Sequence, residues 1–190
     1  MKPLDRKTEI ITVAAQLFKE KGYSAVTMRD IAQAMNIKAA SLYNHIKSKQ
    51  EILVLIIIEI AEEFTSTILQ IVSSDESTIE KLKKVIQLHI DITVRNPDAL
   101  ACLNNDWMHL EAEKLAYFVT MREEYEEHFR TIIKQGMAQG ELKNLNVEVV
   151  IFSTLSTLRT LYLWYGKKKS PNESVLKTAM TEVLLQGIVS

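Results

Sequence analysis

The sequence has few of the residues that disulfide-bonded or turn-rich proteins use: its 190 residues include one cysteine, five glycines and three prolines. The single cysteine, Cys102, excludes an intrachain disulfide and is typical of proteins in a reducing, cytoplasmic compartment. Scarce glycine and proline beside abundant aliphatic residues favour helices over a sheet with many tight turns. We therefore expect an all-α protein that is long enough to bury a core without cross-links.

Long hydrophobic runs are also lacking. The densest apolar run, residues 52–60, is interrupted by Glu59 and is far shorter than the roughly 20 residues that span a bilayer. Residues 1–10 are charged and contain no apolar stretch of the kind found in signal peptides. Together these features predict a cytoplasmic protein that does not enter the membrane.

Catalytic and metal-binding motifs are missing as well. The sequence contains no H-E-x-x-H, no glycine-rich phosphate loop and no G-x-S-x-G. The histidines are scattered over separate predicted helices, and the nearest approach to the Glu-x-x-His of a di-iron bundle is Glu124 with His128, one residue too far apart. The sequence thus predicts neither an enzyme nor a cofactor or metal. A helical-bundle enzyme or carrier with no DNA role stays the alternative.

Positive charge is concentrated at the front of the chain. Residues 1–50 carry nine lysine and arginine side chains against four acidic ones, whereas the rest of the chain carries 14 against 20. The front is therefore basic by five charges and the remainder acidic by six, although the whole chain has a net charge of only −1. A basic segment on an acidic body predicts a polyanionic partner for the front part alone.

Helix boundaries are readable from capping residues and apolar spacing. Capping signals precede four of the predicted helices: Thr27 with Asp30, Ser48 with Glu51, Asn146, and Ser170 with Pro171 and Glu173. Nine helices are expected, at about 5–21, 28–35, 38–46, 48–73, 77–96, from Pro97 onward, 113–139, 146–166 and 171–188.

The second and third predicted helices form a helix-turn-helix pattern. Apolar residues are placed to lock the two helices together: Ile31, Ala32, Met35, Ile37 and Leu42. Asn36 falls where the turn requires a positive φ, which asparagine tolerates better than most residues. Small residues at 39–41 would let the start of the third helix approach a DNA groove closely, where recognition helices contact bases.

Residues 27–53 carry the most specific motif, TMRDIAQAMNIKAASLYNHIKSKQEIL. This stretch resembles the DNA-binding signature of TetR-family transcriptional regulators, above all in L-Y-x-H at 42–45 followed by K-S-K at 47–49. The family usually has glycine where this chain has Asn36, and an aromatic residue where it has Ile46. The likeness extends upstream to about residue 8, whereas the rest of the chain matches only in length and helix count.

The resemblance implies roles for the residues of this motif. Thr27, Tyr43 and Lys49 are expected to hold DNA phosphates, and the residues expected to face bases are Arg29, Lys38, Ala39, Ser41 and Asn44. Arg29 is the best candidate for a guanine contact, because a guanidinium pairs with O6 and N7 at once. Two alternatives stay open: Tyr43 packs in the core, and His45 either packs under the turn or contacts a phosphate.

The resemblance also implies an organisation for the whole chain. Residues 1–50 would form the helix-turn-helix DNA-binding domain, and residues 51–190 a helical domain for ligand binding and dimerisation. We expect a homodimer, since two helix-turn-helix domains bound to the two half-sites of a palindromic operator add affinity and specificity. The expected activity is that of a repressor released by a small-molecule effector. A regulator without an effector, whose body serves only to dimerise, is a second alternative.

The predicted helix at 146–166 is apolar on two sides and therefore needs a cover on both. One stripe consists of Val147, Ile151, Thr154, Leu158, Leu161 and Tyr165, and the other of Phe152, Leu155 and Tyr162 with Arg159 among them. TetR-like proteins pair their eighth and ninth helices across the dimer, which implies the same here. Arg159 requires a partner, either in an interface salt bridge or as the anchor of an acidic ligand.

Aromatic and apolar residues in the middle of the chain are candidates for an effector site, although each also suits a plain core. The set is His89, Leu103, Trp107, Tyr117, Met121, Tyr125, Phe152, Leu155, Arg159, Tyr162 and Trp164. The run LYLWY at 161–165, followed by lysines at 167–169, is similar to a TetR subgroup that senses acyl-coenzyme A thioesters. Aromatic rings for a base and lysines for phosphates would suit coenzyme A.

Overall fold

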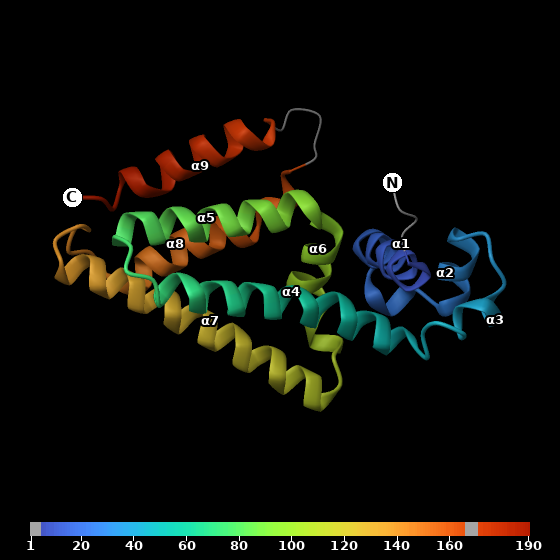
Figure 1. Ribbon diagram of the computed structural model, residues 1–190. Coiled ribbons are helices and arrows are strands. Elements are labelled where there is room, and N and C mark those ends of the chain that lie inside the picture. The colour runs from blue at the N-terminus through green and yellow to red at the C-terminus, as the bar shows by residue number, and fades with distance from the viewer. Residues whose placement is uncertain (1–4, 166–170) are drawn as a thin grey trace. The chain divides into compact units, whose positions relative to one another are not determined.

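The computed structural model describes residues 5–165 and 171–190, and Figure 1 shows their helices. Over these residues the protein contains nine α-helices, three short 3-10 turns and no strand, which confirms the predicted all-α class. The described residues form two compact units. One unit contains the chain up to Ala61 together with Asp98–Val119, and the other contains Glu62–Pro97 together with the described residues from Thr120 onward.

The first unit, here called the reading unit, contains the helix-turn-helix. Its elements are α1 (Arg6–Lys21), η1 (Tyr23–Ala25), α2 (Met28–Ala34), α3 (Ala39–Leu42), the first part of α4 (Lys49–Val72), most of α6 (Pro97–Asn105), η2 (Trp107–His109) and the start of α7 (Ala112–Ala138). The fully buried side chains of its core include Ile10, Phe18, Ile31, Leu42, Ile46, Ile52 and Leu53. Ile31 and Leu42 are among the residues that the sequence predicts to lock the helix-turn-helix together.

The second unit, here called the body, contains the rest of α4 and α7 with α5 (Thr78–Arg95), α8 (Val147–Arg159), η3 (Leu161–Leu163) and α9 (Glu173–Gln186). α5 is buried on most of its surface and contacts both α8 and α9. α9 runs alongside α5 in Figure 1. Lys177 on α9 forms an ion pair with Asp91 on α5 at 2.6 Å.

Three predicted boundaries were wrong. α3 spans only Ala39–Leu42, because a short hydrogen bond from the His45 N–H to the Leu42 carbonyl (2.9 Å) tightens the chain into a turn. α8 ends at Arg159, where the hydroxyl of Thr160 donates to the Ser156 carbonyl at 2.8 Å and the chain continues as η3.

The third wrong boundary is the start of α9. The helix begins at Glu173 and is capped by Asn172, whose side-chain oxygen accepts from the Val175 N–H at 2.9 Å. The expected cap Ser170 and the lysines at 167–169 lie outside the described residues. Among the described residues, no helix is long and apolar enough to cross a membrane.

Candidate functional site

The start of α2 is held by a complete capping box. The Asp30 N–H donates to the Thr27 hydroxyl oxygen at 3.2 Å, and the Thr27 N–H donates to the Asp30 carboxylate at 2.8 Å. The Thr27 hydroxyl also donates to that carboxylate at 2.6 Å, and these bonds hold the pKa of Asp30 below its usual value. A DNA phosphate would therefore compete with Asp30 for the hydroxyl proton of Thr27.

The turn after α2 has the geometry of a Schellman motif. Asn36 has φ of 54°, the only positive φ among the described non-glycine residues, as the sequence predicts. The Ile37 N–H donates to the Ala32 carbonyl and the Asn36 N–H to the Gln33 carbonyl, both at 3.0 Å. This turn sets the angle at which α3 leaves α2 and so determines which side of α3 faces solvent.

The side chains on and after α3 divide cleanly by burial. Leu42 and Ile46 are buried, at 0% and 1% exposed. Tyr43 is 54% exposed and His45 is also exposed, so packing in the core is wrong for both residues. Lys38, Ser41 and Asn44 are exposed as well, and Ala39 is half-buried. The residues predicted to read DNA thus lie on the solvent side of α3 and the turn after it.

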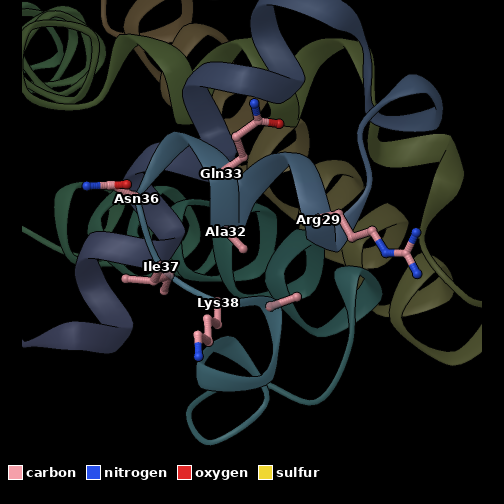
Figure 2. A pocket seen from close by; sticks show the side chains of 7 residues that line it. Arg29, Ala32, Gln33, Asn36, Ile37 and Lys38 are labelled. Carbon is pink, nitrogen blue, oxygen red and sulfur yellow. The ribbon is translucent and has the colours of Figure 1, made fainter.

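An open hollow of about 510 Å³ lies between α2 and the start of α3. It is lined by Arg29, Ala32, Gln33, Asn36, Ile37, Lys38 and Ala39 (Figure 2). The long polar side chains do not converge on one point: in Figure 2 those of Arg29 and Lys38 extend in different directions. Such an arrangement suits an extended partner better than a small ligand.

Gln33 and Asn36 were not expected at this site from the sequence. They follow Arg29 at spacings of four and seven residues, which places all three on one side of α2 and its turn. That spacing is the signal that would have found them. Glutamine and asparagine amides recognise adenine in the major groove in the way that arginine recognises guanine.

Lys49 is tied to the protein's own backbone. Its ammonium donates to the carbonyls of Tyr23 (2.9 Å) and Val26 (2.8 Å) and lies 4.2 Å from the centre of the Tyr23 ring. Burial lowers the pKa of Lys49. Two of its three protons are thus used to hold the start of α4 to the segment that leads into α2, and one proton is left for the predicted phosphate contact.

In the body, a buried polar pair lies on α5 and α7. Nε2 of His89 lies 2.8 Å from the hydroxyl of Tyr125, and the ring of Phe64 packs against both, with centroid distances of 4.7 and 5.7 Å. Burial lowers the pKa of His89 to about 3 and raises the pKa of Tyr125. The nearby positive charge of Arg159 adds to the lowering of the pKa of His89 and partly offsets the raising of the pKa of Tyr125.

Arg159 finds its partner within the same chain. Its guanidinium lies 2.7 Å from the carboxylate of Glu126 on α7, and both side chains are partly exposed. Within the chain, α7 thus supplies a carboxylate for Arg159, and an additional partner across a dimer interface stays a prediction. A second cation, Arg122, lies 4.0 Å from Glu126. The region combines a buried hydrogen-bonding pair, aromatic side chains and an arginine that is paired with a partly exposed carboxylate.

The structure brings only some of the predicted effector residues together. Met121, Tyr125, His89, Leu155 and Tyr162 are buried in the body, and Arg159 lies near His89 and Tyr125. Leu103, Trp107 and Tyr117 belong to the reading unit, where Trp107 packs on Phe118. Phe152 and Trp164 are exposed. Phe152 is exposed because the buried side of α8 is formed by Ile151, Thr154, Leu155 and Leu158.

α8 and α9 each leave apolar side chains in solvent. Phe152 on α8 is 73% exposed and Val183 on α9 is 70% exposed, and Val149 and Val175 are both more than half exposed. Apolar residues at such spacing on one side of a helix are typical of a surface that a partner covers.

The buried histidine predicts a dependence of stability on pH. Folded protein keeps His89 neutral down to about pH 3, whereas the unfolded chain takes up a proton below about pH 6.5. The unfolded state then binds more protons, so the free energy of unfolding falls as pH drops from 6.5 towards 3, by at most about 1.4 kcal/mol per pH unit. His89→Gln, which keeps a polar partner for Tyr125, should remove this part of the acid slope in urea titrations.

The matched control is His128→Gln, which removes another histidine from the same bundle and should keep the wild-type slope. An acid slope in His89→Gln equal to that of wild type would show that His89 is not the buried neutral group.

These features define a class of protein before any comparison: a helix-turn-helix DNA-binding protein with a separate helical body. Among the described residues, no group of three or more His, Cys, Asp or Glu side chains is arranged to hold a metal ion.

Comparison with known families and structures agrees with this class. The family model described as bacterial regulatory proteins of the tetR family matches residues 10–56, and the model described as the tetracyclin repressor-like C-terminal domain matches residues 75–188. The chain belongs to the TetR family of transcriptional regulators. It is a DNA-binding regulator rather than an enzyme.

Individual relatives are similar over more than nine-tenths of their length. The HTH-type transcriptional repressor KstR2 of Rhodococcus jostii (strain RHA1) is 26% identical over 187 residues, which cover 97% of this chain and 92% of the relative. The ketosteroid transcriptional regulator KstR2 of Mycobacterium tuberculosis has the same fold, with a TM-score of 0.91, 21% identity and coverage of 100% and 97%. AibR, solved with isovaleryl coenzyme A and operator DNA, has a TM-score of 0.78, 22% identity and coverage of 94% and 97%.

Proposed function

We propose that this protein is a dimeric, cytoplasmic repressor that binds a palindromic operator and is released from it by a small acidic effector. The observation that carries the DNA-reading part is the exposure of Tyr43, His45 and the polar residues of α3 beside buried Leu42 and Ile46. Thr27, Tyr43, His45 and Lys49 would hold phosphates, and Arg29, Lys38, Ala39, Ser41 and Asn44 would face bases. The predicted DNA-binding segment, residues 1–50, contains all of them.

Dimerisation through α8 and α9 is the second part of the proposal. The exposed apolar residues of both helices, Phe152 and Val183 foremost, would be buried in a four-helix interface with a second copy. Burial of apolar surface is the main favourable term in protein association. A single DNA-binding domain with a modest excess of positive charge binds DNA weakly. Linkage of two such domains in a dimer adds affinity without a new contact within either domain.

An effector with an anionic group and an apolar part fits the body best. Arg159 would bind the anionic group in place of Glu126, and the His89–Tyr125 pair would accept or donate a hydrogen bond to a polar atom of the same ligand. Met121, Leu155 and Tyr162 would supply apolar surface. An acyl-coenzyme A thioester has these features, and AibR is described in complex with one. A change in the tilt of α4 on ligand binding would alter the spacing of the two readers.

The experiment that tests the proposal is selection of binding sites from a random duplex library, together with the mass of the protein in solution. A palindromic consensus and a dimeric mass support the repressor. Enrichment of no sequence, with and without acyl-coenzyme A thioesters, would contradict the DNA-reading role and favour the alternative of a helical carrier.

Arg29→Ala should weaken binding to the selected operator by about 1–3 kcal/mol and relax discrimination at one base-pair position, because a bidentate guanine contact is lost. Binding to a set of single-base operator variants measures this. Uniform weakening across the set would instead assign Arg29 to the DNA backbone. Lys21→Ala, which removes an exposed charge outside the hollow, is the control for general electrostatics.

Arg159→Leu should abolish the response of operator binding to acidic ligands while the protein stays dimeric and binds the operator. Competition of a panel of acyl-coenzyme A thioesters against operator binding, with solution mass, measures both. Dissociation to monomers would contradict the role of Arg159 as a ligand anchor and would instead assign it to the dimer interface. Arg95→Leu, which breaks an exposed ion pair with Glu63 in the same unit, is the matched control.

A further inference from the structure

The turn after α7, residues 140–143, connects three parts of the body. It begins at Gly140, whose φ of 76° lies in the left-handed region that favours glycine. The Leu142 N–H donates to the Gly136 carbonyl at 3.1 Å, and the Leu142 side chain is buried, at 2% exposed. The turn is therefore fixed to the end of α7, and Glu141 lies between its two fixed residues.

The side chain of Glu141 binds the start of α5. Its carboxylate accepts hydrogen bonds from the N–H groups of Thr78 at 3.1 Å and Ile79 at 3.4 Å. These bonds, that to Thr78 foremost, lower the pKa of Glu141 below its usual value. The next N–H, that of Glu80, donates to the hydroxyl oxygen of Ser77 at 3.3 Å. Glu141 and Ser77 together thus satisfy the first three N–H groups of α5, which no carbonyl within the helix can accept.

The backbone of the same turn pairs with residues 188–190, which follow α9. The Ser190 N–H donates to the Glu141 carbonyl at 3.1 Å, and the Lys143 N–H donates to the Ile188 carbonyl at 2.9 Å. An antiparallel β-bridge lies between these two bonds. Glu141 therefore binds α5 through its side chain and the segment after α9 through its carbonyl, and all of these residues belong to the body.

α9 buries little of its own surface within the chain. Leu176 and Leu185 are the buried residues among its 14, and the helix packs along α5 (Figure 1). The ion pair of Lys177 with Asp91 attaches the first half of the helix to α5. Since most helices in proteins are held by the packing of a buried side, a helix with so little buried surface depends on the attachments at its ends. The bonds to the turn after α7 are the attachment at the C-terminal end.

We propose that residues 140–143 form a clip for α9 and that Glu141 is its positioning residue, which fixes the C-terminal end of α9 on α5 in the arrangement that a second copy binds. This inference rests on the proposed dimer through α8 and α9 and names a residue that sets its strength. Val183, the most exposed apolar residue of α9, lies less than two turns before the clipped segment. A surface that is ordered before association loses less entropy on binding, so an open clip weakens the dimer.

Ser190→Pro opens the clip from the side of α9. Proline has no backbone N–H, so the bond to the Glu141 carbonyl is lost while every residue of α5 and α7 is unchanged. Ser190→Ala is the matched control, because it removes the hydroxyl and keeps the N–H. The amides of residues 181–187 should exchange with deuterium about threefold faster or more in Ser190→Pro than in Ser190→Ala, as measured by mass spectrometry. Exchange of subunits between isotope-labelled and unlabelled protein, followed by native mass spectrometry, should also be about threefold faster or more.

Glu141→Ala opens the clip from the side of α5 and should speed both kinds of exchange in the same way, because the turn loses its two bonds to α5. Glu141→Gln keeps a side-chain oxygen that accepts from Thr78 and should lie between Glu141→Ala and wild type. Ser77→Ala is the control for damage to α5 alone, since it removes a cap of the same helix that has no bond to residues 188–190. It should leave the deuterium exchange of residues 181–187 within about twofold of wild type.

Equal deuterium exchange in Ser190→Pro and Ser190→Ala, or in Glu141→Ala and Ser77→Ala, would overturn the clip, because α9 would then be held without it. Faster deuterium exchange in α9 with unchanged exchange of subunits would overturn the role of Glu141 in dimerisation. A wild-type protein that is monomeric in solution would overturn the proposed dimer instead. The deuterium comparison of Ser190→Pro with Ser190→Ala needs no dimer and still decides whether residues 140–143 hold α9.

Discussion

Phe152→Asp is expected to convert the protein to a monomer and to weaken operator binding by about a hundredfold or more. In one chain the side chain is 73% exposed, so an aspartate there stays hydrated and leaves the fold intact. In the proposed interface the same aspartate would be buried twice, once from each copy, without a partner. An unpaired buried charge costs several kcal/mol, which is a large part of the stability of a typical dimer. Solution mass and operator titration measure the two effects.

The matched control is Leu69→Asp, which makes the same kind of change at a half-exposed residue of α4. It should remain dimeric and bind the operator as wild type does, with circular dichroism showing that both variants are folded. A dimeric Phe152→Asp protein with wild-type operator affinity would remove α8 from the interface. Dissociation of both variants to monomers would show that neither position reports on α8 specifically.

Lys49→Met should lower both the stability of the protein and its affinity for every DNA sequence. Loss of the ammonium leaves the carbonyls of Tyr23 and Val26 without their charge-assisted hydrogen bonds, and we expect a loss on the order of 2 kcal/mol in the free energy of unfolding. The third ammonium proton is expected to donate a hydrogen bond to a DNA phosphate. Its loss should reduce the slope of log affinity against log salt by about 0.9.

The two readouts separate the two roles of Lys49. Unchanged stability would contradict the tie to Tyr23 and Val26, and an unchanged salt slope would remove Lys49 from the phosphate contacts. Lys47→Met is the control, because Lys47 is an exposed lysine two residues away and lies outside the cluster around Tyr23. It should leave the free energy of unfolding within about 0.5 kcal/mol of wild type.

Features set by neighbouring residues were predictable from the sequence. The capping box of Thr27 and Asp30, the positive φ of Asn36 and the cap at Asn146 are all present as expected. Each depends on hydrogen bonds or backbone preferences within a few residues, so the local sequence is sufficient. The helix-turn-helix and the family follow from the same short segment.

Helix boundaries were predicted less well where the local sequence allows the helix to begin or end at more than one residue. Ser170 and Asn172 both suit an N-cap by residue type, and Asn172 caps α9 at Glu173. The apolar residues after Arg159 extend the predicted stripe, yet α8 ends at Arg159 and the chain continues as the 3-10 turn η3. The sequence also left open which side chains after α3 are exposed, since Tyr43 and Ile46 both suit a core by residue type. The direction in which the chain leaves α3 decides that Ile46 is buried and Tyr43 is not.

The sequence by itself determined the all-α class, the helix-turn-helix, the family and the side of α3 on which the DNA-reading residues were sought. Only the tertiary structure decided that Lys49 bonds to Tyr23, that Arg159 pairs with Glu126, and that residues 98–119 belong with the reading helices. An amphipathic pattern shows that one side of a helix must be covered, and a charged residue on an apolar side shows that it needs a counter-charge. Neither pattern identifies which segment covers the helix or which residue supplies the counter-charge. Contacts between residues as far apart as Tyr23 and Asp106 depend on how the whole chain folds back on itself, and no short segment carries that information.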